Sequence, residues 1–306
     1  MAALLAQRLL QSLAVLLGVA IITFLLLHYL PADPAALVAG RSANAQMIAS
    51  VRHQLGLDLP VPLQFWRYLS GLVRGDLGRS YIQRSEVLTL VAARIPATLV
   101  LMACGIFVEV ALGLTFGIIA AVRRNGFVDR MVMMLAFVGV SSPQFVVALL
   151  LLYVFAAQLG WFPMSGYGTP SHVVLPALTL GLLGAGWYAR MVRSAMIDVL
   201  HQDYVRTARA KGLAGSRVVL RHALPNALLP IVAMIGIDIG QFMGGVVVVE
   251  AVYGWPGIGQ LAWQAIQEAD VPIIMGVTLV SSLAIVLGNL LADLVAPLLD
   301  PKIRVR

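Results

Sequence analysis

The stretch ATLVLMACGIFVEVALGLTFGIIAAV, Ala97–Val122, decides the fold class of this chain. It contains one charged side chain, Glu109, in 26 residues. A membrane-spanning helix needs about 20 consecutive apolar residues, so this run is long enough to cross a bilayer. It also holds Cys104, the only cysteine of the chain, which excludes a disulfide framework and a cysteine-based metal site.

The composition of the whole chain is that of a membrane protein. Hydrophobic residues make up 60% of the 306 residues and charged residues 11%, whereas soluble domains are about 25% charged. Mean hydropathy is +0.91. We therefore predict an all-α membrane protein with six transmembrane helices. The apolar segments are Leu9–Leu30, Ala97–Val122, Met131–Gln158, Val173–Ala189, Ala227–Val252 and Ile273–Ala292.

Two of these segments contain a proline. Pro143 lies within the third segment and Pro230 in the first turn of the fifth. Proline removes a backbone hydrogen bond, and neighbouring helices make such breaks tolerable in lipid. We expect kinks at both positions.

Lysine and arginine residues set the expected orientation. Seven of them lie between Arg190 and Arg221, three between spans two and three, and three in the C-terminal tail, whereas residues 159–172 and 253–272 contain none. Because cytoplasmic loops carry an excess of positive charge, both ends of the chain are expected in the cytoplasm. The predicted organisation is a first transmembrane helix (1–30), a periplasmic segment with interfacial helices (31–96) and a five-helix core (97–306) that includes a cytoplasmic loop (198–225).

The predicted periplasmic segment has an amphipathic stretch. Phe65, Trp66 and Tyr68 alternate with Arg67 and Arg74 at helical spacing. Such a helix can lie on the membrane surface with its aromatic face down. A docking surface for an external partner is the alternative interpretation.

The loop DYVRTARAKGLAGSRVVLRHALPNALLP, Asp203–Pro230, is out of character for an apolar chain, with four arginines and one lysine up to Arg221. We predict one helix over Asp198–Lys211, with Tyr204, Val205 and Ala208 as its apolar stripe and Gly212 as its C-terminal stop. A second short helix is predicted over Arg217–Leu224, capped by Ser216 and ended by Pro225.

The positive charge of this loop can contact anionic lipid. However, small residues such as Thr207, Ala208 and Ala210 are interleaved with the charges ahead of a glycine turn, and small side chains let another surface approach closely. This pattern favours a protein partner on the cytoplasmic face.

The same loop resembles the permease subunits of bacterial ABC importers, which carry the pattern E-A-A-x3-G-x9-I-x-L-P before their last two spans. Aligned on Gly212, this chain matches at Ala208, Gly212 and Leu224-Pro225, and departs at Arg206, Thr207 and His222. The departures are similar to the peptide-transporting branch, whose loop reads DYVRTARAKG. LGLD (55–58), GDLGRS (75–80), EAVYGWPGIG (250–259) and DPKIR (300–304) extend the resemblance, which is closest to dipeptide and glutathione permeases.

The resemblance implies a coupling helix that docks on a separate ATPase. It implies a second homologous permease, two cytoplasmic ATPase subunits that hold the ATP and magnesium, a periplasmic substrate-binding protein and a location in the bacterial inner membrane. Membrane lipid is an expected contact and nucleic acid is not. The residues expected to couple to the ATPase are Asp203, Tyr204, Arg206, Thr207, Ala208, Lys211 and Gly212.

The chain offers no catalytic or cofactor-binding motif of its own. A Walker A loop needs lysine followed by serine or threonine, but Lys211 and Lys302 are followed by glycine and isoleucine. The five histidines have no paired spacing typical of a metal site. The glycines of YGWPGIG follow a span rather than a strand, which indicates a turn and not a dinucleotide site.

The fifth apolar segment carries two patterns. Gly236, Gly240 and Gly244 form a small-x3-small ladder that favours close helix packing. Asp238, Gln241 and Gly245 fall on another face and are candidates for the translocation pathway. An intramembrane carboxylate is costly and faces either a wet cavity or a partner, so Asp238 meets a substrate ammonium group or bridges two helices. For Glu109 we favour a structural role, and Glu250, near a span end, is expected to be satisfied by water or headgroups.

The sequence thus predicts a permease that imports small peptides by alternating access. A nickel or metallophore permease has the same architecture and stays open. An ion-driven secondary transporter, with Asp238 or Glu109 as proton carrier, is a further alternative, against which the basic loop argues.

Overall fold

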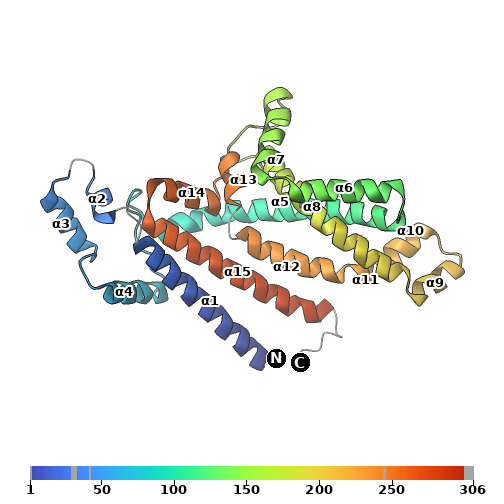
Figure 1. The fold of residues 1–306 in the computed structure, drawn as a ribbon, viewed down its shortest axis with the longest axis horizontal. Helices are drawn as coiled ribbons and strands as arrows, with labels where there is room; N and C mark the ends of the chain where they lie inside the picture. Colours follow the sequence, from blue (N-terminus) through green and yellow to red (C-terminus); the bar gives the residue numbers. More distant parts are fainter. Residues whose placement is uncertain (1, 29–32, 41–42, 244–245, 300–306) are drawn as a thin grey trace. The chain divides into compact units, whose positions relative to one another are not determined.

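The computed structural model describes residues 2–28, 33–40, 43–243 and 246–299. These residues form helices joined by turns, with one isolated β-bridge between Arg79 and Glu86 (Figure 1). The helices are α1 (Ala2–His28), α2 (Pro34–Ala39), α3 (Ala45–Gln54), α4 (Val61–Val73), α5 (Val87–Val122), α6 (Phe127–Ser141), α7 (Gln144–Leu151), η1 (Leu152–Gln158), α8 (Pro170–Leu200), α9 (Asp203–Ala210), α10 (Gly215–Arg217), η2 (Val218–Ala223), α11 (Leu224–Ala227), α12 (Leu229–Met243), α13 (Val247–Val252), α14 (Ile258–Glu268) and α15 (Val271–Leu299).

The helices include several that are suited to a bilayer. α5, α8 and Val271–Leu290 of α15 are each long and apolar enough to cross one. Two bent pairs pass the same test if each is a single span, which brings the described total to five, and α1 adds a shorter apolar helix over Leu10–Leu25. Each predicted apolar segment overlaps one of these helices, so the helical fold class is confirmed. The number of spans and their orientation stay predictions.

The chain divides into two compact units, which we describe separately. The first is drawn from residues up to Thr98 and from Pro256–Val286, and the second from Leu99–Met243, Val248–Trp255 and the residues from Leu287 onward.

In the second unit, glycines bring α5 and α8 into direct contact. A Cβ added to Gly113 would lie 2.1 Å from the Cβ of Tyr188, and one added to Gly117 would lie 2.6 Å from the Cβ of Val192. Real Cβ atoms do not approach this closely, so the two helices could not pack as they do with alanine at these positions. Small residues are typical of helix contacts inside membranes, where packing rather than hydrophobicity holds helices together.

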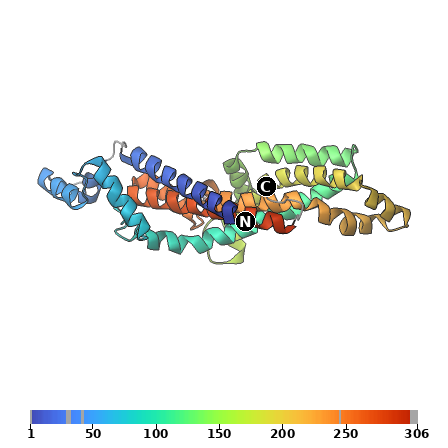
Figure 2. The same ribbon diagram turned by 90° about the horizontal axis from the view of Figure 1, so that it is seen from below.

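α6 lies along the other side of α8 (Figures 1 and 2). A Cβ on Gly186 of α8 would lie 2.4 Å from the carbonyl oxygen of Ala136. At the start of α6, Arg193 of α8 forms a two-point ion pair with Asp129, with Nε–Oδ1 and Nη2–Oδ2 distances of 2.6 and 2.7 Å. The backbone N–H of Asn125 donates a further bond of 2.8 Å to Asp129.

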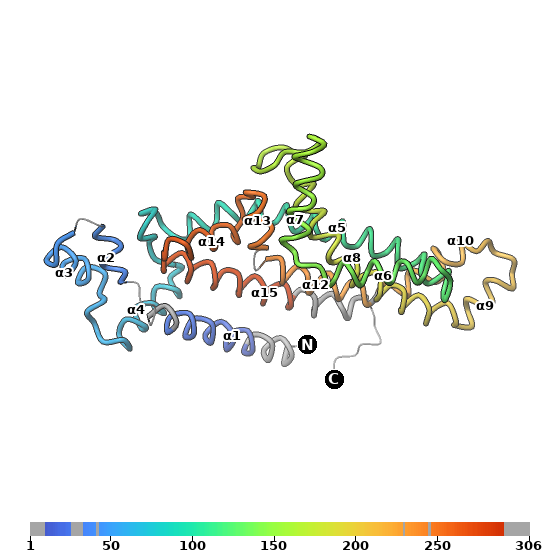
Figure 3. Tube along the Cα trace, turned by 45° about the horizontal axis from the view of Figure 1, so that its top comes forward, coloured from blue at the N-terminus to red at the C-terminus, as the bar shows by residue number. Residues whose placement is uncertain are grey.

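The chain breaks at Pro143 far more sharply than a kink. α6 ends at Ser141, α7 begins at Gln144, and the two helices meet at 104°. Ser142 and Pro143 are both extended, with ψ of 131° and 133°. For Ser142 the cause is Pro143, because proline disfavours a helical conformation in the residue before it. Figure 3 shows the chain turning at this point. The break at Pro230 is smaller, with 54° between Gly215–Ala227 and Pro230–Met243.

In the first unit, the predicted interfacial segment is helical, as α2, α3 and α4. The aromatic face of α4 packs against α1, because the rings of Phe65 and Tyr68 lie 5.2 and 5.9 Å from that of Phe24. Trp66 is 68% exposed. Part of the predicted membrane-facing surface is therefore covered by α1.

A buried carboxylate joins two distant segments of this unit. Asp270, between α14 and α15, is fully buried. It accepts a 2.5 Å hydrogen bond from the hydroxyl of Ser80, and bonds of 3.2 and 3.1 Å from the backbone N–H groups of Tyr81 and Ile82. The GDLGRS motif thus ends in a residue that holds the turn before α15.

Candidate functional site

The predicted glycine stop of the basic loop is confirmed. α9 ends at Ala210, and Gly212 has φ of +74°, a conformation that favours glycine. The N–H of Gly212 donates to the carbonyl of Arg209 (3.0 Å), and the N–H of Leu213 donates to that of Ala208 (3.4 Å). These two bonds are those of a Schellman cap, which satisfies the last carbonyls of a helix and fixes its exit direction.

α9 has one buried and one exposed face. Val205 and Ala208 are 0% and 6% exposed. They pack against Val218 of η2, with Leu213 covering the same small core. The predicted apolar stripe is therefore right for Val205 and Ala208, whereas Tyr204 is 43% exposed.

The structure separates the predicted coupling residues into two groups. Ala208 lies inside the loop, where it packs between α9 and η2. The others lie on the surface of the loop: Asp203, Tyr204, Arg206, Thr207, Lys211 and Gly212.

The side chains of the surface group make few contacts with the rest of the chain, and these contacts are exposed. Asp203 and Arg206 form an exposed ion pair of 3.3 Å, and the Thr207 hydroxyl bonds to the Asp203 carbonyl at 2.9 Å. Nδ2 of Asn226 donates to the Tyr204 hydroxyl at 2.9 Å, which joins α9 to α11. Pairs this exposed contribute little to stability, so these side chains can exchange their contacts for those of a partner.

The predicted helix bounds in this loop are wrong in three places. α8 continues to Leu200, and Gln202, with ψ of 149°, starts α9 as a separate helix. Pro225 does not end the second helix, because η2 shifts the hydrogen-bond pattern and Pro225 takes a first-turn position of α11, where its missing N–H is not needed. Ser216 lies inside α10 rather than at its cap.

The loop is packed onto the long helices behind it. Ala223 and Ala227, on the η2–α11 stretch, are 0% and 2% exposed. They share a core with Val192 and Met196 of α8 and with Ile231 of α12. Buried apolar contacts therefore connect the loop to α8 and α12.

Asp238, a candidate for the translocation pathway, has a partner in this chain. Its Oδ2 accepts a hydrogen bond from the hydroxyl of Tyr188 on α8, which is the helix-bridging role considered for it. Gln241 is exposed. Gly245, the third member of the predicted face, lies outside the described residues.

One member of the predicted glycine ladder, Gly240, packs on another helix of the same chain. A Cβ added to Gly288 of α15 would lie 3.0 Å from both Cα and N of Gly240. Gly236 is buried. Gly244 lies outside the described residues.

Glu109 of α5 is 4% exposed. Its Oε2 atom is buried and makes no hydrogen bond with the part of the chain that the structure describes. Its other carboxyl oxygen lies so near Gly184 of α8 that a Cβ there would be 1.7 Å away. Glu109 is thus enclosed by the α5–α8 contact.

The YGWPGIG motif forms a turn, as predicted. Gly254 has φ of +59°, and Tyr253 and Trp255 are each 2% exposed. The Tyr253 hydroxyl bonds to Thr179 of α8 at 2.9 Å and donates to the carbonyl of Ala148 at 3.1 Å. The expectation that Glu250 is satisfied by water is wrong, because it is fully buried.

Two features escaped the sequence analysis. They are the Asp129–Arg193 ion pair and the close contacts at the glycines of α5 and α8, which hold these helices together. The repeated glycines of Ala97–Val122 were a visible signal for the glycine contacts.

Among the described residues, no group of three or more histidine, cysteine, aspartate or glutamate side chains could hold a metal ion.

Comparisons with known proteins bear on the whole chain. Residues 113–305 match the family described as binding-protein-dependent transport system inner membrane component, and residues 1–102 match the N-terminal part of such components. The chain is 45% identical over 298 residues to the glutathione transport system permease protein GsiC of Pectobacterium atrosepticum, with 97% of both proteins covered. The proteins of that name in Salmonella typhimurium and Escherichia coli K12 are each 44% identical, with the same coverage.

A solved structure shares the fold. The inward-facing MetNI methionine ABC transporter aligns with a TM-score of 0.58 at 20% identity, over 69% of this chain and 96% of that one.

Proposed function

The chain belongs to the family of inner-membrane components of binding-protein-dependent transport systems, and we propose that it imports glutathione and other small peptides. It is a transport subunit, in an importer of the ABC class. The observation that carries the substrate class is the nearly full-length similarity to glutathione permeases. The motifs of the loop and of the turn before α14 support the same branch.

In this proposal six spans place both ends of the chain in the cytoplasm. The distribution of lysine and arginine supports this orientation. Residues 31–96 then form the periplasmic segment, residues 97–306 the five-helix core, and α9 to α11 the cytoplasmic coupling loop.

The complete importer contains a second homologous permease, two ATPases and a periplasmic binding protein. ATP and magnesium are held by the ATPases. α9 seats in a groove of one ATPase, with Asp203, Tyr204, Arg206, Thr207 and Lys211 at the contact and Gly212 at the turn. Closure of the ATPases on ATP pushes α9, and the packed core behind it moves α8 and α12 to open the pathway outward.

The pathway itself lies between the two permeases. Gln241 is exposed on α12, and Asp238 is half-buried beside it. We place both at the pathway, together with Gly245, and assign Gly236, Gly240 and Gly244 to helix packing. Tyr188 holds the Asp238 carboxylate in position.

Uptake of radiolabelled glutathione by proteoliposomes that contain the complete importer tests this function. ATP inside the liposomes and the binding protein outside are expected to support uptake, and an ionophore that collapses ion gradients is expected to leave it unchanged. Gly212→Arg should abolish uptake, since a long side chain at the turn blocks docking while the surrounding space in this chain is open. Uptake that needs an ion gradient but no ATP would contradict the proposal.

A further inference from the structure

The first unit contains an open-mouthed cavity of about 700 Å³. Small-molecule sites typically occupy about 300–1,000 Å³. Its walls come from the end of α1, the turns around α2 to α4, the GDLGRS loop and the start of α15. In the proposed orientation it lies on the periplasmic side.

Four charged side chains line this cavity, and two of them are already paired. Arg52 contacts Asp33 at 2.6 Å, and Asp33 also caps α2 through the N–H of Ala35. Arg67 and Asp76 are different. Neither lies within 4.0 Å of an opposite charge on the described residues. The cavity therefore presents one unpaired guanidinium and one unpaired carboxylate that do not neutralise each other.

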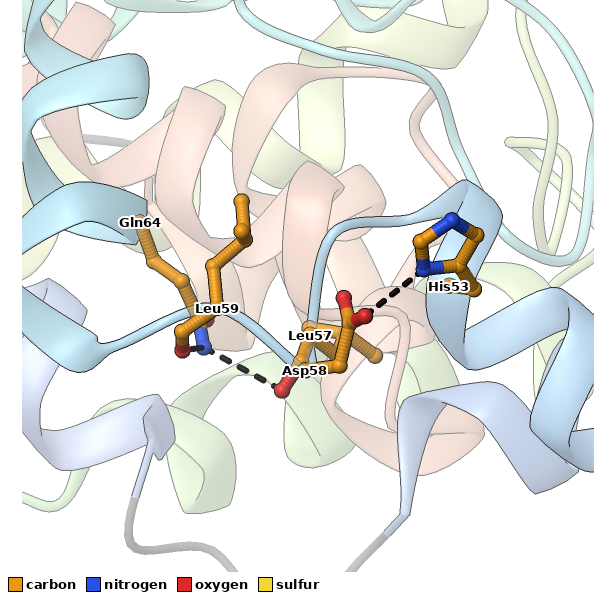
Figure 4. A network of polar contacts seen from close by, with 5 residues as sticks. All are labelled: His53, Leu57, Asp58, Leu59 and Gln64. Carbon is orange, nitrogen blue, oxygen red and sulfur yellow. Dashed lines mark hydrogen bonds and ion pairs between the residues drawn. The ribbon is translucent and has the colours of Figure 1, made fainter.

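The turn before α4 is built to receive the Arg67 side chain. Gly56 has φ of +67°, and a Cβ there would lie 3.0 Å from Nη1 of Arg67. The amide nitrogen of Gln64 donates to the carbonyls of Leu57 and Leu59 at 3.2 and 2.8 Å (Figure 4).

The nearest acidic residue on this turn is engaged elsewhere. The Asp58 carboxylate is bonded to Nδ1 of His53 at 2.7 Å (Figure 4). That hydrogen bond is the main cause that lowers the pKa of Asp58, and the positive charge of Arg67 adds a smaller contribution. Arg67 therefore lies near the Asp58 charge but forms no ion pair with it, and its guanidinium stays open to a ligand at the cavity.

The Asp76 carboxylate is positioned by one backbone hydrogen bond. Its Oδ1 accepts a 2.8 Å bond from the N–H of Gly78, which leaves Oδ2 available. Gly71 of α4 fixes the loop to the helix, because a Cβ there would lie only 3.3 Å from the Asp76 carbonyl oxygen. α4 and the loop therefore hold Arg67 and Asp76 in fixed positions at the same cavity.

The remaining wall is apolar. Phe24, Leu57 and Met275 line the cavity beside the ring of Tyr68. The Tyr68 hydroxyl is buried and has no hydrogen-bond partner on the described residues, and burial raises its pKa to about 12, so it stays neutral. A small movement of α4 toward a polar ligand would supply the missing partner.

We propose that this cavity binds a zwitterionic small peptide, with its carboxylate on Arg67 and its ammonium group on Asp76. Two residues span about 7 Å, so a dipeptide places its ends at separate points of one cavity. This inference rests on the proposed function and extends it, because it gives the permease an entry site of its own for peptides that leave the binding protein.

Equilibrium dialysis tests the proposal on the intact importer in nanodiscs, without its binding protein. The probes are dialanine, N-acetyl-dialanine, which lacks the ammonium group, and dialanine amide, which lacks the carboxylate. The wild type is expected to bind dialanine about tenfold more tightly than either blocked probe, the effect typical of a hydrogen bond to a charged group.

Charge-neutral variants assign each end of the probe. Arg67→Gln should bind dialanine about tenfold more weakly and no better than its amide, and Asp76→Asn should bind dialanine no better than its acetylated form. Arg67→Lys should keep the preference for a free carboxylate. Arg74→Gln, at the C-terminal cap of the same helix but off the cavity, should match the wild type.

The proposal is overturned if the wild type binds no dialanine, if it binds all three probes equally, or if Arg67→Gln and Asp76→Asn match the wild type. Uptake of glutathione and dialanine by the same importer, with binding protein and ATP, separates this failure from failure of the proposed function. Uptake without these binding differences removes the cavity site alone, whereas absence of uptake removes the peptide function.

Discussion

Arg193 of α8 donates hydrogen bonds of 2.6 and 2.7 Å to the two carboxylate oxygens of Asp129 at the start of α6. The Asp129 side chain is 4% exposed and that of Arg193 26%. Arg193 lies about two turns before the end of α8 at Leu200, where the chain enters the basic loop. It therefore anchors the helix through which the loop is proposed to act.

Removing one partner should destabilise this anchor. Asp129→Asn leaves the Arg193 guanidinium without its counter-ion, and breaking a buried pair costs about 3 kcal/mol. Thermal unfolding of the detergent-solubilised protein should show a clear fall in Tm. The double variant Asp129→Asn with Arg193→Gln should lose less than the sum of the single changes. The exposed Asp203–Arg206 pair is the control, since its loss should cost less than about 0.5 kcal/mol.

Glycines at the α5–α8 contact should resist even the smallest substitution. Gly113→Ala and Gly184→Ala place a Cβ against Tyr188 and Glu109, and overpacking of this kind costs about 1–3 kcal/mol or more. Size-exclusion profiles should show a loss of folded protein. Gly18→Ala is the matched control, because nothing lies within 4 Å of its new Cβ. Equal behaviour of all three would contradict the packing described.

The proposed orientation can be read from cysteine labelling. Cys104 is replaced by serine, and single cysteines are placed at Arg74 and Arg209, which are both exposed. A membrane-impermeant maleimide added to spheroplasts should label the first, and should label the second only after permeabilisation. Labelling of Arg209→Cys in intact spheroplasts would reverse the proposed orientation.

Alkaline titration should reveal the buried tyrosine of α4. Burial raises the pKa of Tyr68 from its ordinary value near 10 to about 12. Since the folded pKa is the higher one, its contribution to stability is complete below pH 10 and is lost as pH rises toward 12. The phenolate absorbance of the wild type minus that of Tyr68→Phe should therefore rise near pH 12. A difference that rises near pH 10 would show that Tyr68 is exposed.

The sequence predicted the helical class because most apolar runs reach the length of about 20 residues that a span needs, and the shorter run Val173–Ala189 lies within the longer helix α8. It predicted the stop at Gly212 because left-handed backbone is a local property of glycine. The local preferences of proline predicted less well how the helices continue after it. Pro143 marks a break, but the 104° between α6 and α7 depends on contacts with other helices, and Pro225 is tolerated because η2 changes the hydrogen-bond pattern before it.

The site was predictable in outline but not in its pairings. The spacing within α9 placed Val205 and Ala208 on the apolar face, but it did not show that Val218, across the glycine turn, covers them, or that Tyr204 stays exposed. Tyr188 and Asp238 meet only because α8 and α12 pack together, and Arg67 and Asp76 share a cavity only after α4 and the following loop have folded. These relationships join segments whose separation along the chain carries no periodic signal.

The central claim is that the loop from Asp203 to Ala227 docks on an ATPase, and copurification tests it most directly. The importer is solubilised from its native membrane, and the permease is captured as wild type, as Gly212→Arg and as Gly212→Asn, a smaller residue that tolerates left-handed backbone. The account predicts that an ATPase copurifies with the wild type, is retained at least in part by Gly212→Asn, and is lost with Gly212→Arg. Both variants should stay folded with a small fall in unfolding temperature, because each places a side chain at a positive φ. Capture of equal amounts of ATPase by the wild type and Gly212→Arg, or of none by the wild type, would contradict it.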